Sequence, residues 1–224
     1  MTPNRGGPFV PPGRSGLVQV RHLPSSAPMK KRFLGLARGE RGQAMVEMAL
    51  VLPLLLFLII ATIEFSLLLN ARNTVSFASR DASMLAAEGG SRAGTDCVVL
   101  QQVERDLVAP ASAIKVNQIK VYWSDQNGDE IGSNHNLYTR GGTFTCDYGD
   151  GTSVTVPYTL TYAGYIEGVR CDVLAGCGGS HTQLDNIGVE VQYVHLWLTA
   201  FGRVTGGTGL TFNVTTTTRL EPQL

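Results

Sequence analysis

A carboxylate inside a long apolar run is the feature of this sequence with the clearest chemical meaning. Glu47 follows Gly42 and Gln43 closely and stands just inside a run that continues without a charge from Met48 to Ile63. A charge near the core of a bilayer is unfavourable by several kcal/mol, so such a residue is a candidate for function. A membrane anchor by itself needs no carboxylate here. We therefore expect Glu47 to interact with another group.

A second carboxylate, Glu64, lies near the end of the apolar run and has two interpretations. It can pair with Arg72 two helical turns further on, at the boundary of a membrane. It can instead contact another subunit. The first is favoured, because long side chains near a membrane interface reach water.

The cysteines all follow the apolar run, at Cys97, Cys146, Cys171 and Cys177. An even number confined to one part of the chain indicates disulfides in an oxidising compartment. Of the three possible pairings we favour Cys171 with Cys177, which closes a short loop containing glycine, and hence Cys97 with Cys146. A four-thiolate zinc site is the alternative, disfavoured because no closely spaced Cys-x-x-Cys pair occurs.

Two acidic, glycine-containing segments resemble calcium loops only loosely. Residues 125–130 place oxygen-bearing side chains at alternate positions but lack the distant glutamate of an EF-hand. Asn127-Gly128 is also a strong hairpin turn, so we predict a hairpin rather than a calcium site. The same prediction applies to residues 147–151.

Catalytic patterns are not found in the sequence. The histidines lack metal-ligand spacing, and they are His22, His135, His181 and His195. His195 stands on a predicted strand and is interpreted as a structural or surface residue. Because no nucleophile elbow, P-loop or dinucleotide fingerprint occurs, we predict a protein that is not an enzyme, with no cofactor and no metal.

The apolar run itself predicts a helix that crosses a membrane. It extends past Glu64 through Leu69, and about 20 mainly apolar residues suffice to cross the hydrocarbon. We predict a span at about residues 45–69. Residues 1–42 hold eight Lys or Arg and one acid, a net charge of +7 that the remaining residues balance. The positive-inside bias therefore keeps the N-terminus cytoplasmic and sends residues 91–224 across the membrane.

Periodic patterns predict the elements that follow. One helix is expected over residues 43–90, with an amphipathic second half, and a short helix from Thr95 to about Val108, capped by Thr95 or Asp96. Alternating apolar and polar residues then predict half-buried antiparallel strands. These strands lie at residues 114–123, 154–162, 189–199 and 210–218.

Three details predict how the strands are arranged. Pro157 indicates an edge strand, broken alternation near Gln118 indicates a bulge, and the glycine-rich residues 204–209 predict a hairpin turn. The fold class is α+β, a long N-terminal transmembrane and amphipathic helix packed on an extracytoplasmic antiparallel sheet. The expected division is a basic leader at 1–42, the helix at 43–90 and a disulfide-containing domain at 91–224.

The segment from Gly42 onward resembles a known family. Gly-Gln-Ala-Met-Val-Glu-Met-Ala-Leu-Val-Leu-Pro-Leu-Leu-Leu, starting at Gly42, is similar to the type IV pilin superfamily and, within it, to TadE-like pseudopilins of tight-adherence (Tad, or Flp) pili. Ile63-Glu64-Phe65, residues 77–89 and residues 218–222 resemble the same family. The sheet region is similar in kind only.

The resemblance implies a structural, pilin-like protein. A prepilin peptidase would cut between Gly42 and Gln43, removing the leader. Glu47 of one subunit would then pair with the new α-amino group of Gln43 in its neighbour, where a paired buried charge fixes register and an unpaired one is penalised. The size, with its added sheet domain, suits a minor pilin that supports adhesion or secretion.

Partners and location follow from the same resemblance. The partners implied are the prepilin peptidase, the other Tad pilins, the inner-membrane assembly platform and the membrane, without nucleic acid. The location implied is the bacterial inner membrane, crossed once, with incorporation into a pilus left open. Met29 is an alternative start to Met1. The alternative function is a single-pass membrane-anchored extracytoplasmic binding or sensor module. The simplest interpretation of the apolar helix is an uncleaved signal anchor.

Overall fold

One long helix and one sheet dominate the structure. The computed structural model describes residues 39–107, 114–173, 175–179, 181–199, 202, 207 and 209–221. Its elements are α1 (Gly39–Gly89), α2 (Thr95–Asp106), β1 (Ile114–Ser124), β2 (Glu130–Asp147), β3 (Ser153–Ala163), the 3-10 turn η2 (Glu167–Val169), β4 (Asn186–Leu196) and β5 (Gly209–Arg219). The predicted α+β class is confirmed. Residues up to Glu47 and those from Met48 onward form separate units, and the packing below belongs to the second.

The sheet has five strands among the described residues, in the order β3-β2-β1-β4-β5. Every pair of neighbouring strands is antiparallel. β3, which contains Pro157, lies at an edge as predicted, and the pairing of β1 with β4 shifts between Val116 and Gln118, where a bulge was predicted. β4 and β5 pair as predicted, although most of their connecting turn lies outside the described residues.

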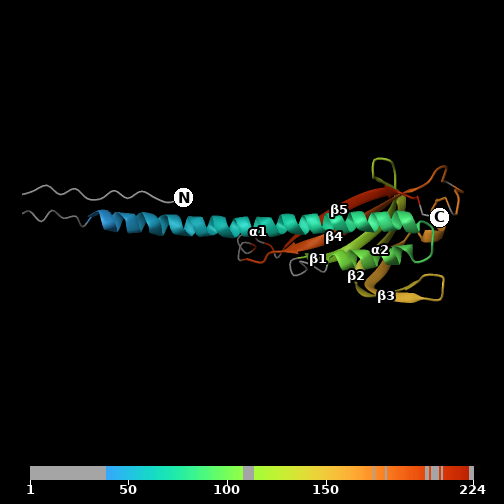
Figure 1. Cartoon of the computed structure of the whole chain (residues 1–224), viewed down its shortest axis with the longest axis horizontal. Coiled ribbons are helices and arrows are strands. Elements are labelled where there is room, and N and C mark those ends of the chain that lie inside the picture. Colours follow the sequence, from blue (N-terminus) through green and yellow to red (C-terminus); the bar gives the residue numbers. More distant parts are fainter. Residues whose placement is uncertain are drawn as a thin grey trace, which may run out of the picture. The chain divides into compact units, whose positions relative to one another are not determined.

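The second half of α1 lies on β4 and β5 (Figure 1), and its contact with them is made by small residues. Serines add hydrogen bonds to this packing, because Ser79 Oγ donates to the Val189 carbonyl at 2.8 Å and Ser83 Oγ lies 3.0 Å from Thr218 Oγ1. Small side chains let the helix approach the sheet closely, and here they form a stripe at helical spacing. The buried members of this stripe are Ala71, Val75, Ala78, Ala82 and Ala86.

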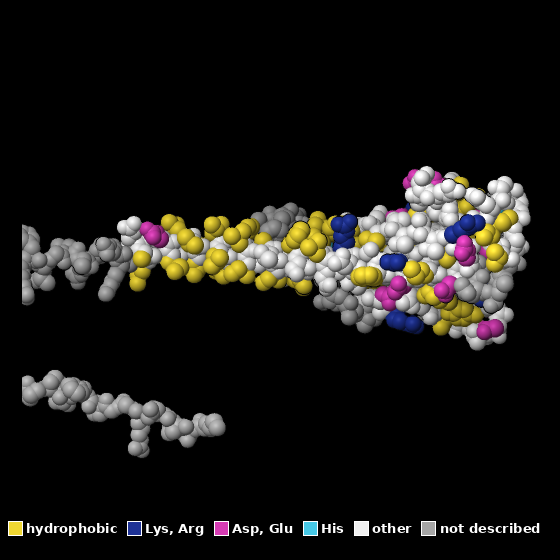
Figure 2. All heavy atoms as spheres, turned by 45° about the horizontal axis from the view of Figure 1, so that its top comes forward, with side chains coloured by type: hydrophobic (Ala, Val, Ile, Leu, Met, Phe, Trp, Pro, Cys, Tyr) yellow, Lys and Arg dark blue, Asp and Glu magenta, His cyan; other side chains and the backbone are white. Residues whose placement is uncertain are grey.

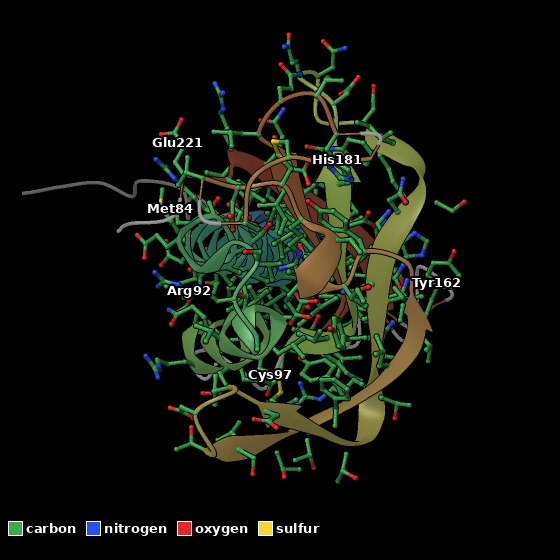
Figure 3. All side chains as sticks on the ribbon, turned by 90° about the vertical axis from the view of Figure 1, so that its right-hand side faces the viewer. Met84, Arg92, Cys97, Tyr162, His181 and Glu221 are labelled. Carbon is green, nitrogen blue, oxygen red and sulfur yellow. A yellow bond between two sulfur atoms is a disulfide. The ribbon has the colours of Figure 1, made fainter. Side chains whose placement is uncertain are left out.

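The shorter helix α2 lies on the same side of the sheet as α1, over β2 and β3 (Figure 3). The carboxylate of Glu104 accepts hydrogen bonds from Arg140 on β2 and Tyr158 on β3. Gln101 Nε2 donates to the Tyr148 hydroxyl at 2.7 Å. The two helices therefore cover one face of the sheet, and the apolar core lies between them and the strands.

Two local predictions were wrong. α2 begins after Gly94, which has a left-handed φ of 79° and makes no side-chain capping bond, rather than after a cap formed by Thr95 or Asp96. The Asp96 side chain turns inward to a buried network instead. The strand β2, which is 18 residues long, was not predicted as a strand.

Candidate functional site

The predicted processing and assembly residues lie on the exposed start of α1. A Cβ built on Gly42 meets no atom within 4 Å, so the described structure gives no packing reason for a glycine there. A glycine inside a helix is about 1 kcal/mol less favourable than alanine, so the choice calls for another explanation. Gln43 Nε2 donates to Glu47 Oε1 at 3.0 Å, one helical turn away. Glu47 is exposed and forms no ion pair with any described residue.

The apolar part of α1 before Ala61 is exposed on every side. Its large apolar side chains, from Met45 to Ile60, each expose between 40% and 76% of their surface. Figure 2 shows apolar side chains along this part of the helix. A helix that is apolar all round belongs in a protein core or in a membrane, and no described residue covers this one. The helix is long and apolar enough to cross a membrane, which fits membrane anchoring.

Glu64 lies at the point where the folded domain begins to cover α1. Its side chain is 1% exposed. Its carboxylate accepts backbone hydrogen bonds from Leu198, at 2.9 Å to Oε1, and from Thr199, at 3.1 Å to Oε2. The favoured pairing with Arg72 was wrong, because the carboxylate of Glu64 binds these amides just after β4. A contact of Glu64 with another subunit stays a prediction. The carboxylate ties this end of the sheet to the helix.

His195, near the end of β4, lies beside this carboxylate. Its Nε2 is 3.7 Å from Glu64 Oε1, beyond hydrogen-bond distance, and its ring is fully buried. Neither ring nitrogen has a hydrogen-bond partner among the described residues. Burial lowers the pKa of His195, and the nearby charge of Glu64 opposes this shift only partly. The histidine is therefore a buried, neutral neighbour of Glu64, in line with its predicted structural role.

A buried ion pair, absent from the sequence-based predictions, fixes the corner between α1 and α2. The carboxylate of Asp96 accepts hydrogen bonds from Arg170 at 2.5 Å, Asn136 at 2.7 Å and Tyr138 at 2.8 Å. Arg170 is fully buried and also donates to the Gly90 carbonyl at 3.4 Å. Burial, reinforced by the Asp96 charge, raises the pKa of Tyr138 far above its ordinary value. No local pattern reveals this network, because its partners are 40 to 74 positions apart.

The cysteines form the two pairs that the sequence favoured. Cys97 on α2 is bonded to Cys146 on β2, with 5.8 Å between their Cα atoms. Cys171 is bonded to Cys177 across a separation of six residues, with 4.7 Å between Cα atoms. The first bond joins a helix to the sheet, and the second closes a small loop. Among the described residues, no group of three or more His, Cys, Asp or Glu side chains is placed to hold a metal ion.

The acidic segments form turns. The Asp125 carboxylate accepts hydrogen bonds from the backbone amides of Asn127 at 2.8 Å and Asp129 at 2.9 Å, closing the β1–β2 hairpin. The bond from Asp129 is the main reason that the pKa of Asp125 is lowered. Asp150 likewise accepts from the Thr152 amide in the turn between β2 and β3. These carboxylates serve their own turns, as the hairpin prediction requires.

Comparison with known proteins agrees with the helix and its residues. This is an α+β protein with one exposed apolar helix, and its residues 42–84 match the family described as TadE-like protein. The resemblance predicted from the sequence is therefore confirmed over a segment that includes Gln43, Glu47 and Glu64. Searches of curated proteins and of solved structures each returned no match. The TadE-like segment supports involvement in a Tad pilus system. It also fits association with a membrane and with other components of the pilus.

Proposed function

We propose that this chain is a minor pilin or pseudopilin that assembles into a Tad pilus. The observation that carries the proposal is the TadE-like segment at residues 42–84, whose helix exposes its apolar surface and its Glu47 carboxylate. An apolar helix exposed to water is unfavourable. The same helix suits a subunit that is first held in lipid and later packs in a bundle of similar helices. The α+β domain would lie on the extracytoplasmic side of the membrane.

The chemistry proposed for assembly is a charge pair between subunits. Cleavage after Gly42 would create a cationic α-amino group on Gln43 at the head of an apolar helix. Among the described residues of the single chain, the hydrogen-bond partner of Glu47 is the Gln43 side-chain amide one turn away. A neighbour's ammonium group is a stronger partner than a neutral amide, because it adds the attraction between two opposite charges, which is large in a bundle of low dielectric constant. The exchange of partners would favour the assembled state.

Processing provides the first test. With a Tad prepilin peptidase present, we expect the mature N-terminus to be Gln43. Gly42→Leu should block the cut because it adds a bulky side chain beside the scissile bond, while the open surroundings of Gly42 leave the fold unchanged. The matched control is Gly39→Leu on the same helix. N-terminal sequencing that finds an intact leader in the wild type, or a cut elsewhere, would contradict the prediction.

The alternative function, an anchored binding module, finds support in one groove. A polar groove of about 290 Å³ lies between the β1–β2 turn and the end of β5. Its lining residues include Asp125, Gln183, Asn186, Thr217 and Arg219. A ligand site normally combines apolar walls with a few polar groups, and this groove is polar and open. The pilin proposal is therefore preferred.

A further inference from the structure

An apolar groove lies where the domain meets the exposed part of α1. The groove has a volume of about 400 Å³, and its walls are almost wholly apolar. It lies between α1 and the segment that follows β4, and the described residues that line it are Leu58, Ala61, Thr62, Glu64, Phe65, Leu68 and Trp197. The buried Glu64 carboxylate forms its one charged wall, already satisfied by two amides. The described walls of the groove therefore suit an apolar occupant.

Further apolar side chains surround the groove. Leu198, directly after Trp197, is 53% exposed, and Leu210 at the start of β5 pairs with His195 and is 40% exposed. On the helix, Phe65 and Leu69 are 59% and 45% exposed. The end of the β4–β5 pair therefore presents apolar surface beside the helix.

The position of this surface along α1 identifies its occupant. From Gly42 to Ile60 a helix with a rise of 1.5 Å per residue is about 27 Å long. That length nearly equals the ~30 Å hydrocarbon thickness of a bilayer, so we place the span at residues 42–60 rather than at the 45–69 expected from the sequence. The domain begins to cover the helix at Ala61 and Glu64, at the depth where the hydrocarbon would end. The groove is thus continuous with the all-round apolar surface that faces lipid.

The geometry points to direct seating of the domain on the membrane. We propose that Trp197, Leu198 and the adjoining groove lie in the headgroup region of the leaflet that faces the domain, with lipid in the groove. Tryptophan is enriched at this depth because its ring is apolar and its N–H is polar. Glu64 holds the segment in place through the amides of Leu198 and Thr199. The inference rests on the membrane anchoring in the proposed function.

The two tryptophans of the chain allow a matched test. Trp123 on β1 pairs with Ile187 at the opposite end of β4 and stacks on His181 at 4.1 Å between ring centroids. Trp197 follows Ile187 by ten positions along an extended chain, which is about 33 Å at 3.3 Å per residue. Trp123→Phe leaves Trp197 as the only indole, and Trp197→Phe leaves Trp123. The full chain is reconstituted in phosphatidylcholine–phosphatidylglycerol vesicles that contain lipid brominated either near the headgroup or near the chain end.

We expect headgroup-proximal bromine to quench Trp197 roughly threefold more than chain-end bromine does, and Trp123 to be nearly unaffected by either. Equal, weak quenching of both tryptophans would overturn the inference. Quenching of Trp197 that falls as the protein-to-lipid ratio rises would assign the groove to a second copy of the chain and would also overturn it. Flotation of the protein with the vesicles is measured separately. Failure to float would refute membrane anchoring itself, whereas flotation without quenching refutes only the seating.

A pair of charge variants sharpens the test. Leu198→Asp places a charge at the proposed interface, and Val173→Asp places one on a side chain of equal exposure, 53%, in the loop closed by Cys171 and Cys177. In the Trp123→Phe background, Leu198→Asp should reduce Trp197 quenching to about a third, while Val173→Asp should leave it unchanged. Equal effects of the two variants would contradict the proposal. The emission of Trp123 in the same variants with Trp123 retained reports that the domain is folded.

Discussion

At the scale of residues, two glutamates on one apolar helix have different surroundings. Glu64 is buried, and its carboxylate has two backbone donors within its own chain. Glu47 is exposed and has a neutral side-chain amide as its hydrogen-bond partner. A carboxylate that is satisfied internally stabilises the fold, whereas one that awaits a charged partner serves assembly. Glu64 thus belongs to the domain, and we propose that Glu47 makes the subunit contact.

Removing each carboxylate should separate these roles. Glu64→Ala leaves the part-buried amides of Leu198 and Thr199 without their acceptor, which should lower the free energy of unfolding by about 1–3 kcal/mol. Glu47→Ala removes an exposed side chain and should leave stability unchanged. Denaturant unfolding of both variants in detergent, followed by Trp197 fluorescence, measures the difference. Equal stability of the two variants would show that the Glu64 contacts do not hold the domain.

His195 should make stability depend on pH. Its pKa is lower in the folded chain than the ordinary value of about 6.5, so the unfolded chain binds the proton more tightly. The contribution of neutral His195 to the free energy of unfolding is therefore fully present above about pH 6.5, and it is lost as the pH falls through the folded-state pKa. His195→Leu should flatten the fall in thermal midpoint below about pH 6.5 relative to wild type. Parallel curves for the two proteins would exclude His195 as the cause.

At the scale of elements, regular patterns were predictable and irregular ones were not. The long helix, the β4–β5 pair and the edge position of β3 follow from apolar periodicity and from Pro157. β2 was missed because Gly141 and Gly142, both with φ of 107°, interrupt its alternation, and its register with β3 shifts between Arg140 and Phe144. The cap of α2 was wrong because Asp96 binds distant partners in the core instead of its own helix.

The bond between Cys97 and Cys146 should be the more stabilising disulfide. It joins α2 to β2 across 49 residues, whereas the bond between Cys171 and Cys177 spans six. The chain-entropy argument gives about 4 kcal/mol for the first loop and about 2 kcal/mol for the second. Mass spectrometry of the exported protein checks both pairings, and unfolding of Cys97→Ala/Cys146→Ala against Cys171→Ala/Cys177→Ala ranks them. A larger loss in the second variant, or four free thiols in the wild type, would contradict this prediction.

At the scale of the whole molecule, an exposed apolar helix continues into an α+β domain. Gly42 and Glu47 were recognisable as candidate site residues because their significance is local, a glycine and a carboxylate at the start of an apolar run. The partners of Glu64 and Arg170 were not, because they come from the segment after β4 and from α2 and meet only after folding. Sequence patterns thus identify the candidate site residues of the N-terminal helix. The structure adds the contacts that hold the domain to the second half of that helix.

Assembly through Glu47 is the central claim, and one measurement tests it directly. Glu47→Ala should still insert into the membrane and be cut after Gly42, but its co-purification with the other Tad pilins after mild detergent extraction should fall at least tenfold, since breaking a buried ion pair removes about 3–5 kcal/mol. Glu88→Ala, which removes an exposed glutamate near the other end of α1, is the control and should associate like wild type. Wild-type association of Glu47→Ala would contradict the claim.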